Sequence, residues 1–269
     1  MIQRLPVSDR LTLVHDPSQK MGKTAGMAKG LFLSYQGELY AGESAGFGLP
    51  VWKTSQQTIF PTLVSAHWSE RNVFEKVFRL DLELRWQLFG VMMPRTFSVV
   101  LEKLAKVYMK RPGQQQLFLR FRNALFGVMR IKSTMWPSGS QGDCRVTYRV
   151  DSGSLLITVD ARSLQGDGML ILLNEVAGRP FSRLRNDEKI QEGQSIPAWQ
   201  PCPFTAILEN PTVGIGFSLR TAASQSCSDR HLDCGREVGR GLDWAGLELT
   251  AEKKYFSYGI NFFEEQRQE

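Results

Sequence analysis

The chain has 269 residues with a formal net charge of +6, and 42% of its residues are apolar and 22% charged. This balance is usual for folded domains and excludes a disordered or fibrous chain. No apolar run approaches the roughly 20 residues that a membrane-spanning helix needs, and the start, MIQRLPVSDR, lacks the apolar core of a signal peptide. We therefore expect a soluble cytoplasmic protein, with reduced cysteines and no membrane association.

The first apolar run, at residues 11–14, is followed by Gly22-Lys23-Thr24, which resembles the end of a phosphate-binding loop. Such a loop needs a glycine five residues before Gly22, where this chain has Pro17. It also needs strand–helix crossovers, whereas the downstream patterns predict hairpins. We therefore predict a solvated loop here, with no bound nucleotide and no cofactor.

The remaining strands are predicted from alternation of apolar and polar residues, which places one face of each strand on a core. The clearest case is residues 78–88, where Phe78 and every second residue to Leu88 are apolar, while Glu83 and Arg85 belong to the polar face. Further strands and hairpins are predicted at residues 30–42, 144–162, 213–219 and 253–263.

Residues 96–111 instead follow helical spacing, with an apolar face and lysines opposite it, and Pro112-Gly113 ends the pattern. Together these patterns predict a mainly β protein: a large antiparallel β-sandwich with one prominent amphipathic helix at residues 96–111. We expect a single domain over residues 1–269, in which residues 132–143 form either an internal boundary or a long loop.

Positive charge is concentrated in residues 95–132. This window holds nine Lys or Arg against one acid, for a net charge of +8, so the rest of the chain is at −2. Such asymmetry is typical of a site for an anionic partner, although a solvated face gives the same pattern. The predicted ligand-binding residues are Lys103, Lys106, Lys110, Arg111, Arg120 and Arg122.

Two further groups of residues could form a catalytic site or a metal site, on weaker sequence evidence. His67 and Glu70 could act as a general acid–base pair in sugar chemistry, or His67 could be an ordinary loop residue. Cys227, His231 and Cys234 are suitable zinc ligands, but their spacing is not that of a standard knuckle and a fourth ligand is not evident. We therefore predict a polar surface loop with no metal there; a zinc site, or a Cys227–Cys234 disulfide in an oxidising setting, is the alternative.

The chain is β-rich, has dispersed tryptophans and ends in GLELTAEKKYFSYGINFF before its last residues, a general pattern that resembles large sugar-handling β-sandwiches. The leading functional hypothesis is a binding protein for a carbohydrate-like or anionic ligand, held in a concave face or groove lined by Trp and Arg. The alternatives are a carbohydrate-active enzyme of isomerase or hydrolase type, and a nucleic-acid or membrane-surface adaptor that uses residues 95–132.

Overall fold

Two antiparallel sheets make up the fold of the part of the chain that the computed structural model describes, which is residues 2–18, 26–97, 100, 124, 126–187, 189–196, 200–221, 230–239, 242–251 and 253–264. The strands are β1 (Gln3–Pro6), β2 (Leu11–His15), β3 (Phe32–Tyr35), β4 (Glu38–Leu39), β5 (Phe47–Lys53), β6 (Thr58–Glu70), β7 (Val73–Leu88), β8 (Val91–Met92), β9 (Lys132–Pro137), β10 (Asp143–Asp151), β11 (Ser154–Asp160), β12 (Met169–Ala177), β13 (Arg183–Arg185), β14 (Ile190–Glu192), β15 (Gln200–Pro201), β16 (Ile207–Asn210), β17 (Ile215–Thr221), β18 (Arg230–Gly239), β19 (Leu242–Ala251) and β20 (Tyr255–Glu264). A 3-10 turn, η1 (Gly193–Ser195), follows β14.

The predicted hairpins form where turn residues separate alternating segments. β10 and β11 pair from Arg145–Asp160 to Asp151–Ser154 around the two-residue turn Ser152-Gly153, in which both residues have positive φ. Gln36-Gly37 joins β3 to β4 in the same way. Positive φ at both turn positions matches the right-handed twist of the strands, which is why glycine recurs there. These strand predictions are confirmed.

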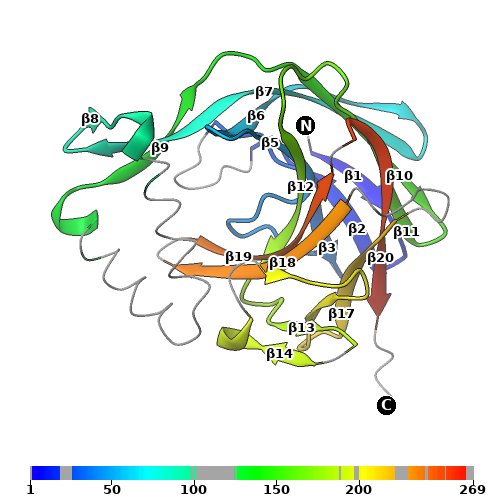
Figure 1. Cartoon of the computed structure of the whole chain (residues 1–269). Coiled ribbons are helices and arrows are strands. Elements are labelled where there is room, and N and C mark those ends of the chain that lie inside the picture. The colour runs from blue at the N-terminus through cyan, green and yellow to red at the C-terminus, as the bar shows by residue number, and fades with distance from the viewer. Residues whose placement is uncertain are drawn as a thin grey trace.

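The large sheet runs in the order β14-β13-β16-β17-β20-β11-β10-β7-β6-β5-β12-β19-β18-β15, and β8 and β9 pair with β7 outside this path. The sheet folds over its own core (Figure 1). Phe47 of β5 and Phe217 of β17 are far apart in sheet order, yet their ring centroids are 5.0 Å apart. The prediction of a mainly β, antiparallel protein is confirmed. The predicted sandwich of two facing sheets is not confirmed, because the opposing faces belong to one continuous sheet.

The small sheet, β1-β2-β3-β4, packs against the large one. Leu11, Leu13 and Leu33 belong to the common core, and the Tyr35 hydroxyl donates a hydrogen bond to Glu264 of β20 at 3.4 Å. An isolated bridge between Leu31 and Phe47 joins the segment before β3 to the large sheet. The N-terminal strands are therefore part of the same packing unit.

A buried asparagine stabilises the irregular point where β12 meets β5. The register shifts between Leu173 and Asn174, and Asn174 is fully buried. Its Oδ1 accepts hydrogen bonds from the Gly48 amide at 3.1 Å and the Tyr258 hydroxyl at 2.9 Å. Its Nδ2 donates to the carbonyl oxygens of Leu172 and Leu247, both at 3.2 Å. All four side-chain hydrogen-bonding positions are therefore used in the core.

The predicted helix at residues 96–111 falls mostly outside the described residues; the structure describes helical residues at 95–97, 100, 124 and 126–128. A prominent helix is thus not supported. No helix in the described ranges is long and apolar enough to span a bilayer. Residues 132–137, the start of the expected boundary, form β9, and Ser138 and Gln141 bond through their amides to β7 carbonyls. The single-domain expectation remains a prediction.

Candidate functional site

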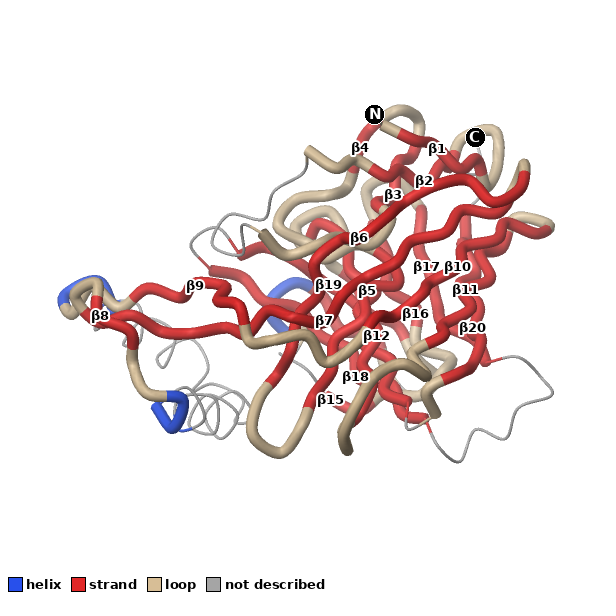
Figure 2. The backbone as a smooth tube through the Cα atoms, turned by 90° about the horizontal axis from the view of Figure 1, so that it is seen from above, coloured by secondary structure: helices blue, strands red, loops and turns tan. Residues whose placement is uncertain are grey.

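A three-stranded extension projects from the large sheet and forms the most distinctive surface feature. It consists of residues 82–88 of β7 together with β9, which pairs with residues 82–87, and β8, which pairs with residues 87–88, and we call it the hairpin arm. β6 and β10 flank the first half of β7, while β8 and β9 flank its second half. Figure 2 shows β8 and β9 extending away from the body of the molecule, on the opposite side from the C-terminus.

The tip of the arm is a two-residue turn with an unusual residue in it. Leu88 pairs with Val91, so Phe89 and Gly90 form the turn, with φ values of 51° and 83°. Turns of this kind favour Asn, Asp or Gly at both positions, because a bulky side chain is strained at positive φ. Phe89 is nevertheless 64% exposed, so burial of its ring within this chain does not offset that strain.

A buried carboxylate attaches the start of the basic window to the arm. Glu83, with only 4% of its side chain exposed, lies 2.8 Å from Arg85 Nη1 and 3.2 Å from Arg95 Nε. Arg85 Nη2 also donates a hydrogen bond to the Met93 carbonyl oxygen at 3.0 Å. Alternation along β7 assigns Glu83 and Arg85 to the side that faces water. In the structure they form an ion cluster with Arg95 around the buried Glu83 carboxylate, and this cluster holds residues 93–95.

The other end of the basic window returns to the same arm. The rings of Trp86 and Phe126 pack at 5.2 Å in an edge-on arrangement. The Ile131 amide donates to the Phe126 carbonyl oxygen at 2.9 Å, and Ile131 is buried just before β9 begins. Residues 95–132 therefore leave the arm at Arg95 and rejoin it at Phe126 and β9.

Only part of this basic window is described. Arg95, Arg130 and Lys132 are exposed, with Lys132 opposite Gln87 in the β7–β9 register. The six residues predicted to bind a ligand lie outside the described residues: Lys103, Lys106, Lys110, Arg111, Arg120 and Arg122.

Replacing Glu83 by glutamine is expected to lower the free energy of unfolding by about 2 kcal/mol. The change removes the buried charge that compensates Arg85, whose side chain is 16% exposed, and the ion pair with the more exposed Arg95. Urea unfolding of Glu83→Gln measures the effect. Glu192→Gln is the matched control, because Glu192 pairs with Arg183 at 2.7 Å but is 59% exposed; its loss should stay below about 0.5 kcal/mol. Equal losses in the two variants would contradict the structural role of Glu83.

His67 and Glu70 both lie on β6, but the carboxylate that His67 approaches belongs to Glu75. His67 Nε2 is 3.7 Å from Glu75 Oε1, which is also 3.4 Å from Arg145 Nε. Glu70 lies opposite Val73, beside the turn that joins β6 to β7. The His67 side chain is 54% exposed on the sheet surface. A catalytic role of His67 with Glu70 therefore stays a prediction.

The cysteine–histidine constellation is only partly described. Cys227 lies outside the described residues, His231 is described as backbone in β18, and Cys234 is buried in the core. Among the described side chains, no group of three or more His, Cys, Asp or Glu is placed to hold a metal ion. The expectation of no metal at these residues stays a prediction.

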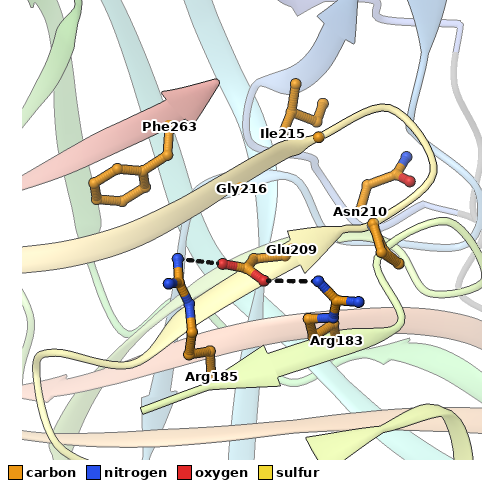
Figure 3. A pocket seen from close by; sticks show the side chains of 9 residues that line it. Arg183, Arg185, Glu209, Asn210, Ile215, Gly216 and Phe263 are labelled. Atoms are coloured by element: carbon orange, nitrogen blue, oxygen red, sulfur yellow. Dashed lines mark ion pairs between the residues drawn. The ribbon is translucent and has the colours of Figure 1, made fainter. Parts of the chain in front are cut away.

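A shallow hollow on β13, β16 and β17 contains an arginine–glutamate–arginine arrangement (Figure 3). Glu209 lies 2.6 Å from Arg185 Nη2 and 3.9 Å from Arg183 Nη1, and Arg183 Nε lies 2.7 Å from Glu192. Gly216 faces Glu209 across the strands, and a Cβ there would lie 3.0 Å from Glu209 Cγ. Each arginine of the hollow is thus paired with a carboxylate: Arg185 with Glu209, and Arg183 with Glu209 and with Glu192, which lies outside the lining.

Buried basic residues form a second feature that the strand pattern did not reveal. Lys76 of β7 is fully buried, and its Nζ donates hydrogen bonds to the carbonyl oxygens of Lys29 and Gly30 at 2.7 and 2.8 Å. Burial lowers the pKa of Lys76 to about 7. Burial, and next the Lys76 charge, lower the pKa of His15 to about 4. A lysine with a near-neutral pKa can act as a base or nucleophile, but this one is enclosed and already bonded, so it connects residues 29–30 to β7.

No family model matches the chain, and no curated protein matches it significantly.

Proposed function

We propose that the protein is a binding protein for an anionic partner, which it contacts through the basic residues 95–132 carried by the hairpin arm. The observation that carries this proposal is that the window of net charge +8 leaves the arm at Arg95 and returns to it at Phe126 and β9. The described cations of the window, Arg95, Arg130 and Lys132, are exposed at these two ends.

Electrostatics support such a role. The rest of the chain carries a net charge of −2, so the window dominates the long-range attraction of an anion. The shielded Glu83 cluster and the Trp86–Phe126 contact hold the ends of the segment on a paired sheet. Holding the ends in place lowers the entropy lost when the segment binds.

Two other functions have less support. An enzyme that uses His67 and Glu70 requires them to face a common substrate site, whereas His67 approaches Glu75 on an open sheet surface. A carbohydrate-like ligand in a concave sandwich face lined by Trp and Arg would require exposed tryptophans around such a face. Trp52 is fully buried, and Trp136, at 48% exposure, lies on the arm. Trp68 on β6 is 37% exposed, and its ring packs on Phe74 at 5.3 Å.

The test is a triple change, Lys103, Lys106 and Lys110 to Gln. We expect weaker binding to heparin, and a shallower dependence of affinity on salt, by up to about one unit per lost phosphate contact when single-stranded DNA is the probe. The matched control changes Arg10, Arg149 and Lys189 to Gln, which removes the same charge from exposed positions outside the window. Equal losses in both variants, or no wild-type binding to any polyanion at low salt, would overturn the proposal.

A further inference from the structure

We infer that the anionic partner is a lipid membrane surface, and that the tip of the hairpin arm inserts Phe89 into its headgroup region. This inference rests on the proposed function, and its attraction to anionic lipid comes from the described, exposed cations Arg95, Arg130 and Lys132. It concerns peripheral attachment by a turn.

The first support is the residue at the tip. Phe89 occupies the first turn position at φ 51°, where Asn or Gly would be less strained, and 64% of its surface is in water. A strained, exposed aromatic residue is unfavourable for the isolated chain, and such outliers concentrate at functional sites. An apolar partner at the tip would account for its presence.

The second support is the surroundings of Phe89. Val91 follows directly on β8 and is 69% exposed. Val128 lies four residues before Lys132 in the chain and is 81% exposed. Lys132 is exposed on β9 opposite Gln87, two residues before Phe89. Apolar side chains next to cations are the composition that binds anionic bilayer interfaces, where each nearby Lys or Arg contributes about 1 kcal/mol.

The third support is shape. Proteins that bind single-stranded nucleic acid without sequence preference use a basic groove with aromatic residues on which successive bases stack. The arm instead projects beyond the body of the molecule (Figures 1 and 2), and the exposed residues at its end include the aliphatic Val91, which cannot stack on bases. A projection with an apolar tip fits a penetrable surface better than a nucleic-acid strand.

The experiment compares Phe89→Asn with the wild type in co-sedimentation with phosphatidylcholine vesicles, prepared with and without phosphatidylserine. Asparagine suits positive φ, so the variant should melt at or above the wild-type temperature. We expect wild-type binding only when phosphatidylserine is present, and an affinity about tenfold lower for Phe89→Asn, from lost apolar burial. Ile190→Asn is the matched control, since Ile190 is 61% exposed on β14, away from the arm, and should not change binding.

Heparin and single-stranded DNA, assayed in parallel, separate the two proposals. If Phe89→Asn loses vesicle binding but keeps heparin binding, the membrane inference is supported. If the wild type binds heparin or DNA but not phosphatidylserine vesicles, or if Phe89→Asn binds vesicles as the wild type does, the inference is wrong while the proposed function stands. If the wild type binds none of these probes, the proposed function is wrong, and the inference with it.

Discussion

Replacing Lys76 by alanine is expected to lower the free energy of unfolding by about 3 kcal/mol at neutral pH. The change removes a fully buried side chain and leaves a cavity inside the large sheet. It also leaves the carbonyl oxygens of Lys29 and Gly30 without their buried donor. The variant also no longer has the cost of burying an ammonium group away from water, but this gain offsets only part of the loss. Chemical denaturation in urea measures the change.

Lys76→Met is the matched variant, because methionine keeps most of the stem and removes the donor. It should lose less stability than Lys76→Ala, and the difference between the two variants measures the free-energy cost of the cavity. Equal losses would show that the hydrogen bonds, and not the packing of the stem, account for the whole effect.

The pH dependence of the free energy of unfolding is an independent test of the burial of Lys76. The folded-state pKa of Lys76 is about 7, below the ordinary value of 10.5, so the unfolded chain binds more protons between these values. Stability from this group therefore rises with pH across that interval and is lost as pH falls to 7. Lys29, with its pKa lowered to about 8, adds a similar rise in every variant. The wild type should gain more stability between pH 7 and 9 than Lys76→Met; equal slopes would contradict the burial of a titrating ammonium.

Replacing Asn174 by alanine is expected to cost about 4 kcal/mol of unfolding free energy. The variant loses four buried hydrogen bonds and leaves the Gly48 amide, the Tyr258 hydroxyl and two carbonyl oxygens to find other partners in the core. Thermal and urea unfolding measure the loss, and the register shift between β12 and β5 makes local repair by sheet bonds difficult.

Asn261→Ala is the control for this change. Asn261 lies on β20, is half-buried and accepts one side-chain hydrogen bond from Ser154 at 3.1 Å, so its loss should be about 1 kcal/mol or less. A similar effect of the two substitutions would mean that the Asn174 network contributes little beyond a single half-buried hydrogen bond.

The sequence predicted the strands well because alternation follows directly from strand geometry. It could not predict what covers each face. In β7 the apolar residues beyond Leu80 leave the main core, and Trp86 packs instead on Phe126, which precedes β9. Glu83 was assigned to water by the same alternation, but its partners Arg85 and Arg95 come from the arm and from the segment after it. Pairing of that kind depends on tertiary contacts that a local pattern does not contain.

The one feature of the candidate site that could be predicted from the sequence was the concentration of positive charge in residues 95–132. The arm and its strained tip were not, because Phe89-Gly90 becomes a turn signal only when β8 is recognised as a two-residue strand. Lys76 offered a signal that could have been used: it stands between Phe74 and Phe78 on the inward side of one alternating strand. A charged residue on an apolar face predicts either an error in register or a buried polar contact.

The place of β20 in the sheet has a consequence for synthesis on the ribosome. β20 is one of the last described segments, yet it lies in the interior of the large sheet, between β17 and β11, with Phe256, Tyr258 and Ile260 fully buried. Until residues 255–264 leave the exit tunnel, β17 and β11 both present open edges, and Phe47 lacks part of its packing. Nascent chains of this protein therefore expose an unpaired edge of β11 from the synthesis of β11 until that of β20, which makes them candidates for chaperone binding before the sheet is completed.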